Sequence, residues 1–475
     1  MWTRELKRIA ALRKKARRQA QKTGTPDARR EYNRLCRESR EATCRTRCDK
    51  WNGACAELDL RDTSKAWRLL RNIEATGVPR TTTPLISPDG EVASAKKMAD
   101  LLNNSFASIS RSEKKTAVSK ALNKERKEKE REPDKPEDLG TYNAPFCRAE
   151  LDRAIAKCKL RKAPGPDKVT PEMFRNLGGM ARDKILEFVN ETWVNSRLPR
   201  AWKKAVVVPI AKKGKDATNV ESYRPISLTS CFGKIAERMV NERLTWSFEA
   251  GGLLAPEQAG FRHGMSSIDQ VNVFVQEVAD GFQRSESTYA VFLDLQQAYD
   301  RVWRPGLYLK LRALGVLGRT YRWIKNFLTG RTICTRLHQC LSGEKVLEQG
   351  LPQGSALSCT LFTAYINDMP SALRCRKLLY ADDIVLWKTG KEAAALQNAL
   401  QTDLHTISAY CEKWQIKVST TKTVWSLFSL GIDILKAPFE LTLSGRRLCC
   451  DNSPKYLGIT LDRKMTMLTH VQEVA

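Results

Sequence analysis

The chain has 475 residues, a formal charge of +28 at pH 7, and a hydrophobic fraction of 42%. That fraction is near the globular average, so a buried core can form, and the length allows about two to four domains. So large a positive charge favours polyanionic partners, above all nucleic acid. No apolar run approaches the roughly 20 residues of a membrane-spanning helix, and no signal-peptide core follows Met1. We therefore expect an intracellular protein without a membrane segment.

Residues 1–110 predict a basic, mostly helical N-terminal extension. Two stretches with few helix breakers are typical of helices, Arg4 to Gln21 and Asp27 to Cys55. Ser94 is suited to cap an amphipathic helix that runs to about Ser108. Residues 111–141 are almost wholly polar and charged and cannot bury a core, so we expect a charged linker or a solvated helix there.

The pattern changes at residue 142, where apolar strand-like runs begin to alternate with helical stretches. Ala205 to Ile210 and Thr288 to Leu295 predict buried strands, and Lys377 to Trp387 predicts a strand, a turn and a second strand. Strands and helices interleave without a regular βαβ rhythm, which favours the α+β class.

Three aspartates in these strands are candidate catalytic residues. Asp294 lies in an apolar strand, where a carboxylate is costly unless it is paired or metal-bound. Asp382 and Asp383 lie between two apolar runs, where a tight hairpin would turn. Two adjacent aspartates at a turn are usually just solvated. Together, however, three carboxylates suit two Mg²⁺ ions about 3.5–4 Å apart, a site for phosphoryl transfer.

A series of short motifs surrounds these aspartates between about residues 155 and 465. In chain order they are Lys162 to Asp167, Pro209-Ile210, Tyr223 to Leu228, Gln258 to Arg262, Phe292 to Asp294, Ala298 to Asp300, Gly350 to Ser355, Tyr380 to Asp383, Trp414 with Lys422, and Tyr456 to Gly458. The series resembles reverse transcriptases of non-LTR (LINE-type) retrotransposons. The resemblance implies a right-hand polymerase fold, with fingers over 142–285, palm and the beginning of a thumb over 286–475, and a core domain over about 192–462.

The resemblance also implies a role for each candidate residue. Asp294, Asp382 and Asp383 would hold two Mg²⁺ ions, for which Mn²⁺ can substitute, and Lys422 would act as a general acid. The nucleotide-binding residues would be Arg224, Lys213, Tyr299, Gln353 and Gly354. The template or primer contacts would be Arg262, Gly350, Tyr456, Leu457 and Gly458. Tyr299 would be a steric gate against the ribose 2′-hydroxyl, with a core tyrosine as the alternative. Lys422 and the lysines near 213 could equally be solvated surface residues.

The sequence departs from the family pattern at three positions. Cys359 stands where proline is usual, Ser419 where asparagine is usual, and Tyr299 where phenylalanine is commoner. The change at Cys359 removes no chemistry, and a tyrosine at 299 still presents a ring. The change at Ser419 removes the amide that would support the late lysine.

The function that the resemblance implies is RNA-directed DNA polymerisation. The expected partners are an RNA template, a DNA primer, dNTPs and element RNA. The expected location is the nucleus and cytoplasm. Only the start of a thumb and no endonuclease domain are expected. An alternative is therefore a truncated, inactive relic that only binds nucleic acid. A viral RNA-templated RNA polymerase is a third possibility, which Tyr299 and the Tyr380 to Asp383 hairpin argue against.

Overall fold

The structure is a computed structural model. It describes residues 4–23, 25–56, 94–112, 116–134, 140–212, 215–216, 218–431 and 439–474. The chain divides into two compact units, residues 1–82 and 83–475. No helix within the described ranges combines the length and apolar character needed to cross a bilayer.

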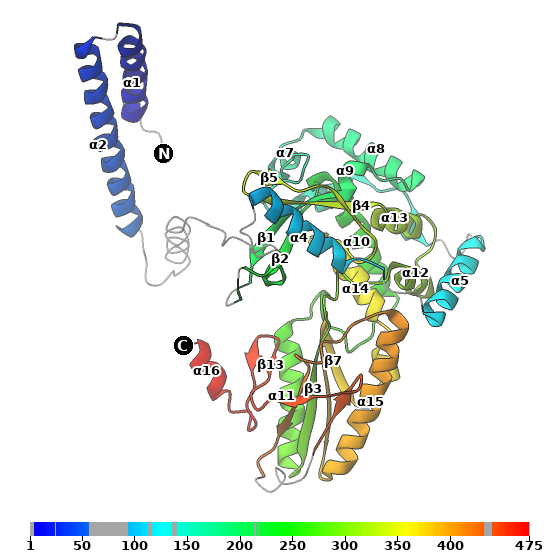
Figure 1. The fold of residues 1–475 in the computed structure, drawn as a ribbon. Coiled ribbons are helices and arrows are strands. Elements are labelled where there is room, and N and C mark those ends of the chain that lie inside the picture. The colour runs from blue at the N-terminus through cyan, green and yellow to red at the C-terminus, as the bar shows by residue number, and fades with distance from the viewer. Residues whose placement is uncertain are drawn as a thin grey trace. The chain divides into compact units, whose positions relative to one another are not determined.

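The first unit contains a pair of helices, α1 (Arg4–Thr23) and α2 (Pro26–Ala56), which lie side by side (Figure 1). Leu6 and Ile9 of α1 and Ala42 of α2 form a small apolar cluster between them. Both predicted helices are confirmed. Most of their remaining side chains are polar and exposed, which explains why the sequence shows few apolar positions here.

The second unit contains two larger sheets, of which the first lies among residues 204–347. Its strands are β1 (Lys204–Ala211), β2 (Tyr223–Leu228), β4 (Arg331–Leu337), β5 (Cys340–Leu341) and β6 (Lys345–Leu347). β1 pairs antiparallel with β2 and parallel with β4. The predicted strand at Ala205 to Ile210 is confirmed. The predicted boundary at residue 285 does not separate the sheets, because β4 joins β1 across more than 100 residues, a pairing that local patterns do not reveal.

Helix α4 (Ala95–Ile109) packs on this first sheet. The Ser94 hydroxyl accepts a hydrogen bond from the Lys97 N–H at 3.3 Å, so the predicted cap is confirmed. Leu102 and Phe106 are buried in one cluster with Val207 and Ile333. The expected N-terminal extension over residues 1–110 is therefore divided, and its last helix belongs to the second unit.

The expected charged linker over residues 111–141 contains a docked helix, α5 (Ala117–Arg131). The Glu130 carboxylate accepts hydrogen bonds from Tyr321 (2.5 Å) and Lys325 (2.8 Å) of α13 (Gly318–Leu328). It also pairs with Arg126 of its own helix at 2.6 Å. Of the two expectations for this segment, the helix is confirmed, but it is docked rather than solvated. Ion pairs hold much of it in place, and such contacts leave no apolar pattern that would predict the docking.

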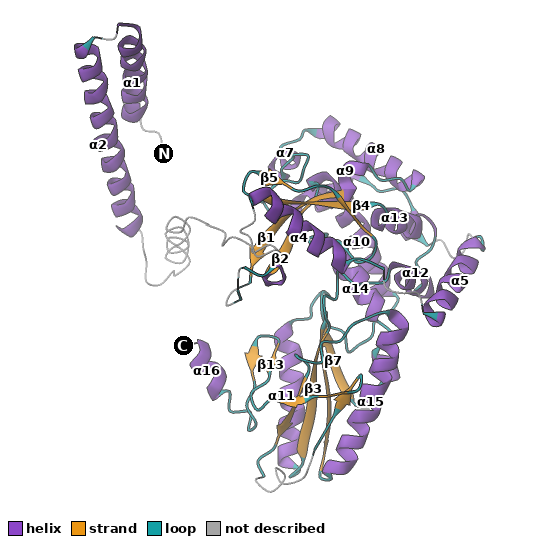
Figure 2. Ribbon diagram, viewed as in Figure 1, coloured by secondary structure: helices purple, strands orange, loops and turns teal. Residues whose placement is uncertain are grey.

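The second sheet carries the predicted aspartates. Its strands, in spatial order, are β12 (Cys449–Cys450), β9 (Val424–Phe428), β3 (Ser287–Asp294), β8 (Asp383–Gly390) and β7 (Arg376–Tyr380). The central strand β3 is antiparallel to both β8 and β9. Figure 2 shows the strands of this sheet in orange between purple helices. The strand predicted at Thr288 to Leu295 and the hairpin at Lys377 to Trp387 are confirmed.

Both faces of the second sheet are covered by helices, α11 (Ser267–Gln283) and α15 (Ala393–Trp414) (Figure 1). Phe292 of β3 packs against Phe274 of α11, with ring centroids 5.8 Å apart. Val291 points to the other face and shares a cluster with Leu404 of α15. Because alternate residues of a strand face opposite sides, two covered faces require the continuous apolar run seen in β3.

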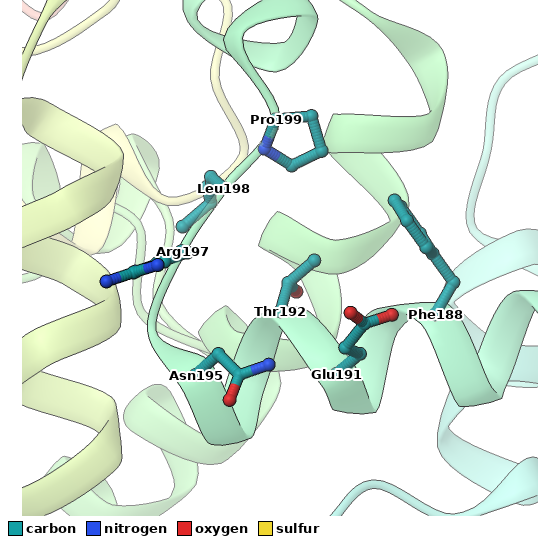
Figure 3. Close-up of a pocket in the computed structure, with 7 residues that line it drawn as sticks. All are labelled: Phe188, Glu191, Thr192, Asn195, Arg197, Leu198 and Pro199. Carbon is teal, nitrogen blue, oxygen red and sulfur yellow. The ribbon is translucent and has the colours of Figure 1, made fainter.

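The remaining helices and short strands complete a mixed architecture, so the α+β class is confirmed. They are η2 (Thr141–Asn143), α6 (Arg148–Ala156), α7 (Pro171–Arg175), α8 (Gly179–Asn195), α9 (Arg200–Lys203), η3 (Val220–Ser222), α10 (Cys231–Ala250), α12 (Arg304–Ala313), α14 (Ser358–Ile366), η4 (Pro370–Ala372), β10 (Thr442–Leu443), β11 (Arg446–Arg447), β13 (Lys455–Tyr456), β14 (Ile459–Thr460) and α16 (Leu468–Val474). A surface cavity of about 670 Å³ lies at the end of α8 (Figure 3). None of the predicted site residues lines it.

Candidate active site

The three aspartates converge at one end of the second sheet. Asp294 is the last residue of β3 and Asp383 the first of β8, and they stand directly opposite each other in the antiparallel register. Asp382 lies in the tight turn that joins β7 to β8, where Tyr380 pairs with Asp383. Residues about 90 positions apart in the chain are thus brought to adjacent places on neighbouring strands.

The electrostatics of this cluster suit a cation. Desolvation by the surrounding protein, together with the charges of Asp382 and Asp294, raises the pKa of Asp383 to about 6, although its side chain reaches the surface. The pKa of Asp382 is also raised, first by burial and then by Asp294. A divalent ion would relieve this repulsion, and carboxylate oxygens are the donors that Mg²⁺ prefers. Among the described residues, no group of three His, Cys, Asp or Glu side chains has the arrangement of a metal site. The fit of the aspartates to Mg²⁺ therefore rests on their position at one end of the sheet and on the chemistry of their oxygens.

Lys422 lies beside the same aspartates. Its ammonium nitrogen is 3.3 Å from Asp294 Oδ2, in an ion pair that is largely exposed and therefore contributes little stability. The Ser419 N–H donates to the Asp294 carbonyl at 2.8 Å, and the Asp294 N–H donates to Thr423 Oγ1 at 3.3 Å. These two hydrogen bonds hold the turn that carries Lys422, with a serine at position 419.

Tyr299 follows Asp294 by five residues and lies at the edge of the site. Its ring stacks on Phe362 of α14, with centroids 4.8 Å apart. Burial raises the pKa of its hydroxyl, and so do the charges of Cys359 and Asp382. The hydroxyl oxygen is buried and has no hydrogen-bond partner in the described structure. The ring is therefore held by packing, and the proximity of Asp382 places it beside the carboxylates.

The loop predicted to contact template and nucleotide lies between Tyr299 and strand β2. Gly350 has φ +81°, and a Cβ there would lie 2.3 Å from the Asp300 carbonyl oxygen, so only glycine fits. The Gln353 side-chain amide donates to Asp300 Oδ2 at 2.7 Å. Gly354 has φ +82°, and a Cβ there would lie 3.2 Å from the carbonyl oxygen of Ser227 on β2.

Arg224 lies on β2, the strand that Gly354 approaches, and its side chain is exposed. No carboxylate of the described residues forms an ion pair with it. Lys212 bonds the Glu221 carbonyl at 2.7 Å. Lys213 lies outside the described residues, so its predicted role stays a prediction.

Arg262 has a different environment from the one expected of a template contact. Its guanidinium donates to both carboxylate oxygens of Glu249, at 2.9 and 2.6 Å. It also donates to the carbonyls of Ala255 and Gln258. These bonds occupy the guanidinium, so the structure gives Arg262 a part in holding its own loop.

Tyr456, Leu457 and Gly458 form a small hairpin beside the sheet. Tyr456 ends β13, and Leu457 and Gly458 turn the chain into β14 with φ values of +49° and +89°. The Tyr456 ring centroid is 5.7 Å from that of Phe292, two residues before Asp294. Burial raises the pKa of the Tyr456 hydroxyl, and so does the charge of Asp383. This predicted primer contact therefore lies next to the carboxylates.

The sequence motif Gln258 to Arg262 has a supporting role that sequence reasoning missed. The buried Gln258 Oε1 accepts hydrogen bonds from the N–H groups of Gly260 (2.8 Å) and Ala381 (3.0 Å). Ala381, with φ +59°, immediately precedes Asp382. A Cβ at Gly260 would lie 2.2 Å from the Ala381 nitrogen. The available signal was a glutamine two residues before a glycine in the motif. In the structure this glutamine supports the turn that carries Asp382.

Gly260→Ala is expected to displace this turn and to lower the rate of primer extension by about 100-fold, since an error of about 1 Å in placement has that effect. The added methyl also overpacks the core, with a loss of about 1–3 kcal/mol in unfolding free energy. Single-turnover extension and urea unfolding measure the two effects. Gly179→Ala is the control, because nothing lies within 4 Å of a Cβ there. Equal rates in both variants would contradict the supporting role.

Comparison with known proteins identifies the family. The family model described as "Reverse transcriptase (RNA-dependent DNA polymerase)" matches residues 210–461, more than half of the chain. The chain is 30% identical to a probable RNA-directed DNA polymerase from transposon BS of Drosophila melanogaster, over 99% of the chain and 52% of that protein. It is 32% identical to the RNA-directed DNA polymerase from mobile element jockey of the same species, over 68% of the chain and 36% of that protein.

A more distant relative is the Pol polyprotein from type-1 retrotransposable element R1 of Bradysia coprophila, at 25% identity over 68% of the chain and 32% of that protein. The chain thus spans about half or less of the length of these curated relatives. Both the motifs and the relatives point to one group of mobile elements. The chain belongs to the reverse transcriptase family and is related to the polymerases of non-LTR retrotransposons.

Proposed function

We propose that this chain is an RNA-directed DNA polymerase that adds dNTPs to a primer 3′-hydroxyl by two-metal-ion phosphoryl transfer. The observation that carries the proposal is the convergence of Asp294, Asp382 and Asp383 at the end of one sheet. Phosphoryl transfer needs positioning and charge neutralisation more than covalent chemistry, and such a carboxylate cluster suits both needs.

Asp294, Asp382 and Asp383 are the residues that would hold the two divalent ions. Ions bound there would lower the pKa of the primer hydroxyl and neutralise charge on the leaving pyrophosphate. The protein's own contribution is to fix the carboxylates through the backbone register of β3 with β8. Lys422, which lies 3.3 Å from Asp294, would donate a proton to the leaving pyrophosphate.

The nucleotide would lie between β2 and the turn after β3. Arg224 would bind the triphosphate, since a guanidinium offers two parallel donors to phosphate oxygens. Tyr299 would contact the sugar, because its ring is held beside Asp382 by stacking on Phe362. Gln353, with its amide nitrogen bound to Asp300, would keep its orientation while it contacts the nucleotide.

The proposed partners are an RNA template, a DNA primer and the RNA of a parent element. The charge of +28 supports them, since cationic side chains bind phosphates without reading sequence. We also infer that the protein works in the nucleus and cytoplasm, where these partners occur. Binding to an RNA–DNA hybrid is expected to weaken steeply with salt.

Primer extension on poly(rA)/oligo(dT) with Mg²⁺ tests the function. We expect dTTP to be incorporated by the wild type, and incorporation to be lost on removal of Mg²⁺. Hybrid binding is measured in parallel by filter retention. Binding without any extension, in either Mg²⁺ or Mn²⁺, would contradict the proposal and support the alternative of an inactive nucleic-acid-binding relic.

A further inference from the structure

A buried arginine that belongs to none of the predicted motifs lies next to the nucleotide loop. Arg304 begins α12, and only 6% of its surface is exposed. Burial lowers its pKa to about 10, so it remains charged at neutral pH. In the described structure it has no carboxylate partner. A buried charge is costly unless its hydrogen bonds are made, so the groups that Arg304 binds must be fixed in place.

Those groups are three backbone carbonyls of one loop. The guanidinium donates to the carbonyl oxygens of Leu347, Gln349 and Gly350, each at 3.0 Å. The Arg304 N–H also donates to the Gln349 side-chain oxygen at 2.9 Å. The planar fork of a guanidinium can satisfy three separated acceptors at once, which the single ammonium of a lysine cannot do in the same geometry.

Further hydrogen bonds connect the same loop to the residues between Tyr299 and Arg304. The Gly350 N–H donates to the Val302 carbonyl at 2.8 Å, and the Leu351 N–H donates to the Tyr299 carbonyl at 2.7 Å. Gln353 is bound to Asp300 at 2.7 Å. One continuous set of hydrogen bonds therefore joins the loop of residues 347–353 to residues 299–304. The bonds of Arg304 lie at one end of this set and the Asp300–Gln353 bond at the other. Tyr299 belongs to one of the two joined segments and Gln353 to the other.

We propose that Arg304 is a positioning residue for sugar selection, which fixes the loop of residues 347–353 against the backbone of Tyr299. The inference rests on the proposed function of Tyr299 and Gln353 as nucleotide contacts. Release of the loop would let Gln353 and the bound nucleotide move relative to the Tyr299 ring. The distance between ring and sugar would then vary, and a ribonucleotide would be tolerated better.

The test measures nucleotide binding apart from catalysis. A poly(rA)/oligo(dT) hybrid ending in a dideoxynucleotide forms a ternary complex that cannot react, and the affinities for dTTP and UTP are compared. We expect Arg304→Lys to weaken dTTP binding by about 10-fold or more and to reduce the dTTP preference at least fivefold, with UTP little affected. Arg243→Lys is the matched control, since Arg243 also binds three carbonyls, those of Tyr142, Ala144 and Pro145, in another part of the unit.

Asp300→Ala provides a second variant should Arg304→Lys fail to fold. It removes the bond between Asp300 and Gln353. Burial raises the pKa of the Asp300 carboxyl to about 6, so loss of this partly buried group is expected to cost little stability. The same loss of preference is expected. The inference would be overturned if the ratio of dTTP to UTP affinity in Arg304→Lys or in Asp300→Ala equalled that of the wild type. It would also be overturned if the wild type bound dTTP and UTP with equal affinity. Failure of the proposed function is distinct, because it appears as no extension of an ordinary primer.

Discussion

Replacement of Asp382 by asparagine is expected to lower the rate of primer extension by about a thousandfold. Asparagine keeps the shape of the side chain but removes the charge that would hold a divalent ion. Loss of about 4 kcal/mol of transition-state stabilisation corresponds to that factor, and ion-mediated charge stabilisation is of this size. The measurement is single-turnover extension of poly(rA)/oligo(dT) at saturating dTTP.

Stability should change little or increase in this variant, because Asp382 is partly buried and lies beside Asp294, and both effects raise the pKa of Asp382. Urea unfolding at pH 7.5 checks this point. Asp280→Asn is the matched control, since Asp280 lies near the end of α11, next to the opposite end of β3. It should retain full activity. A stable Asp382→Asn protein that extends primers as fast as wild type would refute the catalytic role.

Tyr299→Ala is expected to raise the relative use of ribonucleotides by about 10- to 100-fold, within the range that steric discrimination in a pocket achieves. The ring stacks on Phe362 and lies near Asp382, so its loss opens space where the sugar of an incoming nucleotide would lie. Incorporation of UTP and dTTP opposite poly(rA), each as kcat/KM, measures the ratio.

Tyr299→Phe separates the ring from the hydroxyl. The Tyr299 hydroxyl has no hydrogen-bond partner in the described structure, and phenylalanine keeps the stacked ring. The UTP/dTTP ratio of Tyr299→Phe should therefore match that of wild type. A ratio that is unchanged in Tyr299→Ala would show that another residue excludes the ribose.

The palm strands and the aspartate hairpin were predictable because their signals are local. β3 is a continuous apolar run that ends at Asp294, and Asp382 lies in a tight turn between two such runs. That Asp294 and the turn with Asp382 come together was predicted from the family motifs, because hydrophobic periodicity gives no information about it. Their register, with Asp294 opposite Asp383, required the structure.

The features that the sequence did not reveal depend on long-range or polar contacts. The parallel pairing of β1 with β4 joins segments more than 100 residues apart. Helix α5 is held by ion pairs such as Glu130–Lys325, which leave no apolar periodicity. Arg262 forms an ion pair with Glu249. The sequence alone does not distinguish an arginine in such a pair from an arginine that is free to bind template.

Two supporting residues were missed for a related reason. Gln258 and Arg304 act through backbone groups, the Ala381 N–H and the carbonyls of the loop before Leu351. The chemistry of a side chain does not tell which distant backbone groups it will meet, so residue type alone could not assign these roles.

The most direct test of the central claim is the number of divalent ions bound by the carboxylates. Mn²⁺ binding is measured by electron paramagnetic resonance with a dideoxy-terminated poly(rA)/oligo(dT) hybrid and dTTP. The wild type should hold two ions per chain, and the Asp294→Asn/Asp382→Asn/Asp383→Asn protein should lose both while still binding the hybrid. Equal numbers of ions bound with equal affinity by the two proteins would contradict the account.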